Sequence, residues 1–215
     1  MKSYFLSAIV LVLTFHSAVF AQNKPRVGRA AAAKYFQAAK GGSSAEDVMP
    51  ERSPASSGDH YMMLGLGKAM SSSAWDWGGD GKENNVGGFG LGVTYRVGEW
   101  VSSMDLHIRI EYTEFDPRDQ KASKLSFLPM ITFPDATSRF PLYFGGGLGA
   151  GVFLRQADKE SPLSFDYQLV VGARFFDVFE NTGFFLETGL KNHLLLTSSG
   201  QYNSTFFSAG AVITF

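Results

Sequence analysis

The 215-residue sequence has no cysteine and little excess of either charge. Without cysteine the chain forms no disulfide and has no cysteine on which a mature N-terminus could carry a lipid. Basic and acidic residues nearly balance, at 19 and 20, which argues against a nucleic-acid partner. The sequence also shows no metal cluster, phosphate-binding loop or redox motif, so we expect no metal and no cofactor.

One long apolar run stands at the N-terminus, and it has the form of a secretory signal peptide. Lys2 precedes a mostly apolar stretch from Tyr4 to Phe15, and Ala21 stands at a plausible cleavage point. A retained transmembrane helix is the weaker interpretation, because the stretch is shorter than the roughly 20 apolar residues that a spanning helix needs. We therefore predict an exported protein with residues 1–21 as the signal peptide.

Residues 22–58 differ in composition from the rest of the chain. Arg29 to Lys40 have the spacing of a short amphipathic helix, and Gly, Ser and Pro dominate after it. Two interpretations stay open: an extension that docks Tyr35 and Phe36 against the following domain, or a disordered segment. In both cases the sequence predicts an N-terminal extension ahead of one domain that covers residues 59–215.

Within that domain the apolar period is two, which is the period of β-strands. The 24 glycines and 20 phenylalanines of the chain suit closely approaching strands with ring-rich borders. Each strand-like segment is long enough to cross a bilayer when tilted. The eight segments are 60–70, 86–97, 101–115, 121–133, 140–155, 161–176, 182–195 and 203–215.

The connections between these segments alternate in character. Turn-like stretches at 97–100, 134–139 and 177–181 alternate with polar loops, of which the first, residues 71–85, is the longest. An antiparallel up-and-down barrel would place the turns at one end and the loops at the other. The predicted fold class is therefore all-β, an eight-stranded antiparallel up-and-down transmembrane β-barrel.

Charged residues alternate with apolar ones in the predicted strands. Periodicity alone would also fit a soluble β-sandwich, whose charged row faces water. The membrane interpretation is favoured by a seven-position apolar row in segment 161–176, by aromatic residues at strand ends, and by glycines along one face of segments 86–97 and 140–155. In a membrane barrel the charged row faces inward. The predicted polar network of the lumen consists of Asp105, His107, Arg109, Glu111, Asp166, Arg174, Glu187 and Lys191.

The chain ends on an alternating apolar stretch with a terminal phenylalanine. Together with the signal peptide, the eight strands and the alternating connections, this stretch resembles the small outer-membrane barrels of Gram-negative bacteria, typified by the OmpA membrane domain and OmpX. In that family such a C-terminal strand is recognised by the barrel-assembly machinery. The residues that match are Phe207, Ala209, Ala211, Ile213 and Phe215, with Ile213 where an aromatic residue is frequent.

The resemblance implies a place in the cell outer membrane, in contact with membrane lipid and lipopolysaccharide, with the extension in the periplasm. We predict that the protein is a monomer. We also predict a structural or surface-interaction role, because an eight-stranded barrel is just wide enough for side chains to fill its lumen. The alternative is a small passive pore that uses the same inward charges. A third possibility is a lipid A deacylase or acyltransferase built on His193, Ser198, Ser199 and Glu187, but their spacing matches no known motif, so we predict no catalytic residues.

The loop 71–85 offers a further candidate site. Asp76, Asp80, Glu83 and Asn84 could bind calcium or cations that bridge lipopolysaccharide, although their order does not match the EF-hand pattern. Trp75 and Trp77 could contact a surface partner or the outer leaflet. A solvated hairpin tip is the interpretation that we favour.

Overall fold

The computed structural model describes residues 60–215, except 102 and 139. The predicted signal peptide and N-terminal extension lie outside the described residues. In the described part no helix is long and apolar enough to cross a membrane. The strands are β1 (Tyr61–Trp75), β2 (Lys82–Asn84), β3 (Gly87–Glu99), β4 (Asp105–Phe115), β5 (Ala122–Phe133), β6 (Leu142–Arg155), β7 (Leu163–Phe179), β8 (Thr182–Leu195) and β9 (Gln201–Thr214), with short 3-10 turns η3 (Pro117–Asp119) and η4 (Ala136–Ser138).

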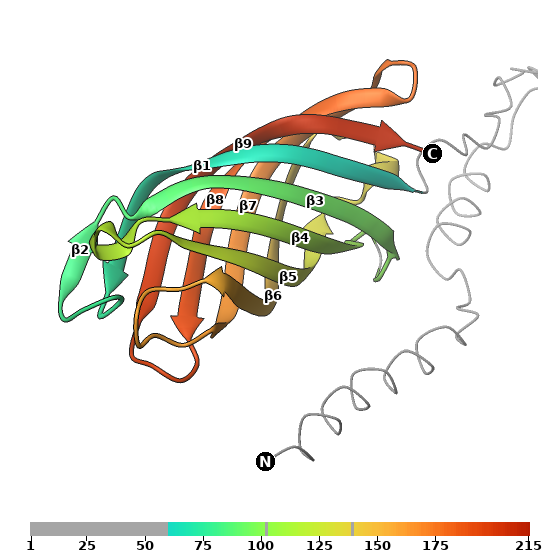
Figure 1. Ribbon diagram of the computed structural model, residues 1–215. Coiled ribbons are helices and arrows are strands. Elements are labelled where there is room, and N and C mark those ends of the chain that lie inside the picture. Colours follow the sequence, from blue (N-terminus) through green and yellow to red (C-terminus); the bar gives the residue numbers. More distant parts are fainter. Residues whose placement is uncertain (1–59, 102, 139) are drawn as a thin grey trace, which may run out of the picture. The chain divides into compact units, whose positions relative to one another are not determined.

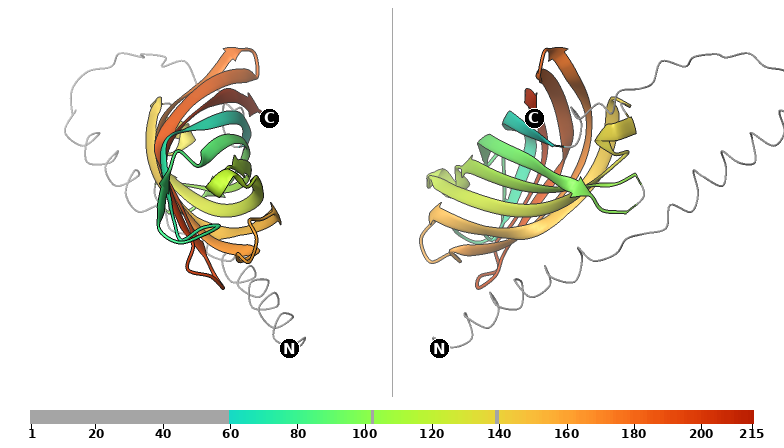
Figure 2. Two further views of the ribbon diagram at one scale, coloured as in Figure 1. Left: turned by 60° about the vertical axis from the view of Figure 1, so that its left-hand side comes forward. Right: turned by 90° about the vertical axis from the view of Figure 1, so that its right-hand side faces the viewer.

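The long strands close into a barrel (Figures 1 and 2). From β1 through β3 to β9, each strand pairs antiparallel with the next, and β9 pairs back onto β1 from Tyr61 and Thr214 to Trp75 and Gln201. The short β2 pairs with the end of β1 and only extends that hairpin. Closure removes the unpaired edges of the sheet. The predicted eight-stranded up-and-down barrel is confirmed.

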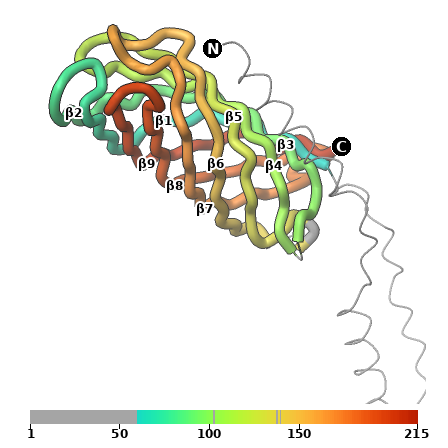
Figure 3. The backbone as a smooth tube through the Cα atoms, turned by 90° about the horizontal axis from the view of Figure 1, so that it is seen from below, coloured from blue at the N-terminus to red at the C-terminus, as the bar shows by residue number. Residues whose placement is uncertain are grey.

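The connections gather at two ends, which we name by their character (Figure 3). The loop end consists of residues 76–86, 116–121, 156–162 and 196–200. The turn end consists of the described residues within 100–104, 134–141 and 180–181, together with His60 and Phe215. Several predicted boundaries were wrong, since β3 runs to Glu99 into the predicted turn and β4 begins at Asp105 instead of residue 101. Residues 71–75, predicted as loop, continue β1 beyond a bulge between Ala69 and Ser71, and residues 177–179, predicted as turn, continue β7.

The barrel has an apolar outside and a polar inside. Along β7, for example, Leu169 is 56% exposed on the outward face, whereas the adjacent inward residue Gln168 is 2% exposed. A water-soluble barrel or sandwich would show the opposite distribution, so this surface is that of a membrane-spanning barrel. Exposed aromatic rings on the outward face border the turn end, as in an interfacial girdle: Tyr95, Phe133, Phe144, Phe175, Phe184 and Phe215.

The last strand lies with its apolar row on this outward face. Phe207, Ala209, Ala211 and Ile213 lie opposite Lys68, Leu66, Leu64 and Met62 of β1. The Phe215 N–H donates to the carbonyl oxygen of His60 at 3.1 Å, so the C-terminus is held beside the start of the first strand. Recognition of Phe207, Ala209, Ala211, Ile213 and Phe215 by an assembly machinery stays a prediction.

The inward row of β6 is built from glycines between two aromatic residues, Tyr143 and Phe153. A Cβ atom at Gly151 would lie 2.6 Å from both Asp166 Oδ2 and Ser164 Oγ. The missing side chains of this row therefore leave the room that larger polar side chains of neighbouring strands occupy.

Replacing Gly151 with alanine is expected to lower the free energy of unfolding by ~1–3 kcal/mol, because the added methyl group overlaps the side chains of Asp166 and Ser164. The matched control is Gly92→Ala, since a Cβ atom at Gly92 meets nothing within 4 Å. Urea unfolding of both variants in the same detergent measures the difference. Equal stability of the two variants would show that the β6 glycines are not required for packing.

Candidate functional site

All eight residues of the predicted network lie on the inward face of the barrel, on β4, β7 and β8. Seven of them are buried, and the Lys191 side chain is 12% exposed. Strand alternation places each charge inside, and the pairing of distant strands then decides which charges meet. They form four groups: one at the turn end, two in the middle and one toward the loop end.

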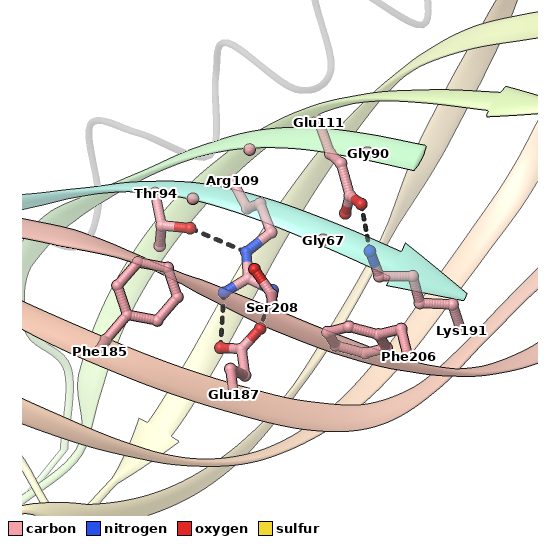
Figure 4. A pocket seen from close by; sticks show the side chains of 12 residues that line it. Gly67, Gly90, Thr94, Arg109, Glu111, Phe185, Glu187, Lys191, Phe206 and Ser208 are labelled. Carbon is pink, nitrogen blue, oxygen red and sulfur yellow. Dashed lines mark hydrogen bonds and ion pairs between the residues drawn. The ribbon is translucent and has the colours of Figure 1, made fainter. Parts of the chain in front are cut away.

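The first middle group is centred on a bidentate ion pair between Arg109 of β4 and Glu187 of β8 (Figure 4). Arg109 Nη1 and Nη2 donate to Glu187 Oε1 and Oε2 at 2.7 and 2.8 Å. Arg109 Nε donates to Thr94 Oγ1 at 2.8 Å, and the Tyr143 hydroxyl donates to Glu187 Oε2 at 2.8 Å. Four strands are thus connected across the lumen by hydrogen bonds that satisfy both buried charges.

One level nearer the loop end, Lys191 of β8 pairs with Glu111 of β4. The ammonium group of Lys191 also lies 4.1 Å from the centre of the Phe206 ring of β9. A cation between a carboxylate and an aromatic face is favourably placed where little water is present.

The group toward the loop end contains Asp166 and two residues that were not in the predicted network, Lys124 and His193. Lys124 Nζ lies 2.8 Å from Asp166 Oδ1 and 2.5 Å from His193 Nδ1, and His193 Nδ1 lies 2.9 Å from Asp166 Oδ1. The Ser164 hydroxyl donates to the same Asp166 oxygen at 2.7 Å. The ammonium group of the buried Lys124 therefore lies in the lumen beside its counter-charge, the carboxylate of Asp166.

The turn-end group surrounds Asp105. Arg96 and Arg174 lie 2.7 and 3.5 Å from the two Asp105 carboxylate oxygens, and the backbone N–H of Ala136 donates to Oδ2 at 2.8 Å. Arg174 Nη1 donates to the Tyr61 hydroxyl at 2.5 Å, and that hydroxyl lies 2.6 Å from His107 Nε2. The connection between β5 and β6 is therefore hydrogen-bonded to the barrel wall through Ala136.

The residues that the sequence analysis missed in these groups share the parity of residues that it found. Arg96 and Thr94 continue the inward row of Gly88, Gly90 and Gly92 in β3. Lys124 follows Ala122 in a mixed inward row of β5, where Leu128 and Met130 hid the alternation. Extending the parity of each strand to its ends would have found Arg96 and Lys124.

Two adjoining cavities of about 20 Å³ each lie beside the middle groups. Both are lined by Gly67, Gly90, Glu111, Lys191 and Phe206. A polar cavity of this size has room for about one water molecule. Side chains therefore occupy most of the lumen at this level.

Aromatic residues close the lumen at the loop end. Trp77, from the first loop, is 1% exposed, and its ring makes edge contacts with Phe115, Phe153 and Tyr202 at centroid distances of 5.1, 5.6 and 6.0 Å. Its indole Nε1–H donates to Gln156 Oε1 at 2.9 Å. Trp77 is thus turned inward, so neither the favoured solvated tip nor the alternative of a surface or leaflet contact holds for Trp77, whereas Trp75 is 46% exposed.

The four connections of the loop end are hydrogen-bonded to one another. Glu160 accepts from the Gly78 N–H of the first loop at 2.9 Å and from the Ser198 hydroxyl of the last loop at 2.5 Å. The Arg118 N–H of the second loop donates to Glu83 Oε2 of the first at 2.7 Å, and the Asp158 N–H of the third donates to Gln120 of the second at 3.0 Å. These contacts hold the loops as one surface, which we call the loop crown (residues 76–86, 116–121, 156–162 and 196–200).

Replacing Glu160 with alanine is expected to release the first and last loops together, because its carboxylate bonds to both. Trypsin should then cleave after Lys82 on the order of tenfold faster, since cleavage follows the population of locally opened chain and one or two lost hydrogen bonds correspond to ~1–2 kcal/mol. Asp158→Ala is the matched control, because Asp158 contacts Gln120 through its backbone N–H, which the substitution keeps. Equal cleavage rates in the two variants would mean that Glu160 does not hold the crown.

The candidate catalytic and metal residues have other partners in the described part of the chain. His193 contacts Asp166 and Lys124 inside the lumen, whereas Ser198 donates to Glu160 in the crown, so these two side chains are not joined. Asp76 accepts from the Gly81 N–H at 2.8 Å within its own loop. Among residues 60–215 without 102 and 139, no group of three or more metal-ligating side chains is found.

Comparison with known proteins gives similar solved structures only. No family model and no curated protein match the chain. The outer membrane enzyme PagL is 16% identical over 68% of this chain and 97% of its own, with a TM-score of 0.48. Neisserial surface protein A (NspA) is 15% identical over 73% and 97%, with a TM-score of 0.46, and the attachment invasion locus protein Ail of Yersinia pestis, solved with the heparin analogue sucrose octasulfate, is 17% identical over 72% and 99%, with a TM-score of 0.41.

Proposed function

We propose that this protein is an outer-membrane barrel with a closed lumen, whose role is structural or lies in surface interaction through the loop crown. The observation that carries the proposal is the set of contacts between loops above a mouth that Trp77 fills. A pore needs an open passage, whereas here aromatic rings and paired charges occupy the lumen. A surface that binds a partner benefits from loops that are already ordered.

The proposed orientation places the loop crown outside the cell and the turn end in the periplasm. The first described strand begins at the turn end and the last one ends there, so an even number of crossings returns the chain to one side. With this orientation the extension 22–58 lies in the periplasm, and the terminal strand presents Phe215 to an assembly machinery on that side.

The exposed side chains of the proposed outer surface are polar and of both signs. Basic groups alternate with acidic ones over neighbouring loops, and the crown has no large apolar patch among its exposed side chains in the described residues. This composition favours a polar or charged partner over an apolar one. The exposed charged residues are Asp76, Asp80, Lys82, Asp116, Arg118, Asp119, Lys121, Asp158 and Lys159.

The absence of cysteine allows a direct test of the orientation with single-cysteine variants. Asp158→Cys places a thiol in the crown, and Asn181→Cys places one in the turn between β7 and β8. A membrane-impermeant maleimide applied to intact cells is expected to label Asp158→Cys, and to label Asn181→Cys only after the outer membrane is opened. Labelling of Asn181→Cys alone on intact cells would reverse the orientation, and the cysteine-free protein controls for background.

The pore alternative is tested separately by single-channel recording in planar bilayers. The filled lumen predicts no conductance steps above the bilayer baseline. Regular steps at neutral pH would contradict the closed lumen and favour the passive pore.

A further inference from the structure

A lysine stands on the lipid-facing side of the barrel wall. Lys68 follows Met62, Leu64 and Leu66 in the outward row of β1, and its cross-strand neighbours are Phe89 and Phe207, both exposed. Within the described residues the Lys68 side chain forms no hydrogen bond or ion pair. An ammonium group at the edge of hydrocarbon extends its flexible stem toward the headgroups, because a charge in lipid without a partner is costly.

At Lys68 the outward face begins to change from apolar to polar, while Met70 at the bulge is still 70% exposed. Beyond it toward the loop end, Ser71 lies opposite Thr205 and Ser73 lies opposite Asn203. Before it toward the turn end, the paired outward residues are Leu66 and Ala209. Lys68 therefore marks the boundary between hydrocarbon and headgroups on this side of the barrel.

The polar rows end at an exposed tryptophan that carries a second cation. Trp75 lies opposite Gln201 of β9 and Lys82 of β2, and Lys82 Nζ lies 5.1 Å from the centre of the Trp75 ring. We call this surface the β1–β9 strip, and it consists of Lys68, Ser71, Ser73, Trp75, Gln201, Asn203 and Thr205.

The β1–β9 strip combines a cation at the hydrocarbon boundary with hydroxyl, amide and aromatic groups above it. An ammonium group at this level meets the phosphate of an anionic lipid. Hydroxyl and amide side chains match sugar hydroxyl groups, which both donate and accept hydrogen bonds. A lipid with only a phosphate would use Lys68 and leave the rest of the strip without a partner.

We propose that the β1–β9 strip binds the phosphorylated sugar headgroup of a glycolipid in the leaflet at the loop end. The phosphate lies at Lys68, and the sugars lie along Ser71, Thr205, Ser73 and Asn203 toward Trp75. This inference rests on the proposed placement of the barrel in an outer membrane, and it identifies the class of lipid that binds the outward surface of β1 and β9.

The test is lipid retention by the full barrel, measured by native mass spectrometry from detergent micelles. The probes are lipid A, which is a diphosphorylated diglucosamine glycolipid, phosphatidylglycerol, phosphatidylcholine and uncharged digalactosyl diacylglycerol. Lipid A is expected to be retained most strongly and phosphatidylcholine least. Lys68→Gln is expected to weaken lipid A retention about fivefold, the effect of one lysine at a charged lipid surface.

Three variants separate the site from general effects. Lys121→Gln removes an exposed lysine of the second loop and is expected to leave retention unchanged, while Lys68→Arg keeps the charge and is expected to retain lipid A. The double variant Ser73→Ala/Asn203→Ala is expected to weaken retention of lipid A but not of phosphatidylglycerol.

The proposal is overturned if Lys68→Gln retains lipid A as the unaltered protein does, or if phosphatidylglycerol is retained as strongly as lipid A. Equal losses in Lys68→Gln and Lys121→Gln also overturn it, because they show a general charge effect. The heat-dependent gel migration of each variant reports whether its barrel is folded. A folded barrel in the outer membrane that fails these tests removes the glycolipid site and leaves the proposed function standing.

Discussion

Replacing Glu187 with methionine is expected to lower the free energy of unfolding by ~3–5 kcal/mol, because the buried guanidinium of Arg109 loses its charged partner. The pair lies deep in the lumen, with side-chain exposures of 7% for Arg109 and 1% for Glu187. Thr94 would remain as a hydrogen-bond acceptor for Arg109, but it carries no charge. The Tyr143 hydroxyl would lose its acceptor as well. Urea unfolding of the refolded barrel, followed by tryptophan fluorescence, measures the change.

The control for this prediction is the double variant Arg109→Met/Glu187→Met. Removing both charges leaves no uncompensated ion, so most of the loss is expected to be recovered. If the double variant were less stable than Glu187→Met alone, the pair would not be coupled as the distances indicate. The comparison also separates the loss of the ion pair from the loss of side-chain volume.

Replacing Trp77 with alanine is expected to cost ~3–5 kcal/mol, which is the usual effect of removing a large buried aromatic side chain. Its ring packs between Phe115, Phe153 and Tyr202, and its loss would leave a cavity at the mouth of the barrel. The hydrogen bond to Gln156 would be lost with it. The measurement is again the urea midpoint in the same detergent.

The sequence supplies a close control for the Trp77 prediction. Trp75 is two residues away and 46% exposed, so Trp75→Ala is expected to change the unfolding free energy by less than ~1 kcal/mol. Similar losses in both variants would contradict the inward position of Trp77. A large loss of unfolding free energy in Trp75→Ala alone would indicate that Trp75, and not Trp77, is the buried tryptophan.

Strand alternation was enough to predict the fold and the inward side of the barrel wall for the eight residues of the predicted network. In β4 the alternation of Asp105, His107, Arg109 and Glu111 with apolar residues has no exception, and all four are buried inside. Alternation also predicts closure, because eight strands with an apolar outward face need a partner for both edges.

Which charges meet could not be predicted in the same way. Arg109 and Glu187 are 78 positions apart, and Lys124 and Asp166 are 42 apart. Their contacts depend on the register of every intervening strand pair and on the tilt of the strands. Neither the register nor the tilt can be read from a single sequence. The inward position of Trp77 could not be predicted from strand alternation either, because Trp77 lies in the loop that follows the end of β1 at Trp75.

The bulge in β1 shows a third limit of the sequence. It inserts one residue between Ala69 and Ser71, so Ser72 and Ala74 take the inward positions and Ser73 and Trp75 the outward ones. A strict alternation from Tyr61 would place these residues on the opposite faces. The outward polar row of β1, Ser71 and Ser73, follows from this shift, whereas Thr205, Asn203 and Gln201 of β9 continue the outward parity of Phe207.

The central claim is that the apolar outward face lies in an outer membrane and encloses the paired charges. The most direct test is the gel migration of the protein from isolated outer membranes, with and without boiling in detergent. The closed barrel predicts that the protein is found in that fraction and that its mobility shifts on heating, because the barrel stays folded until it is heated. A soluble periplasmic protein with one mobility would contradict the account.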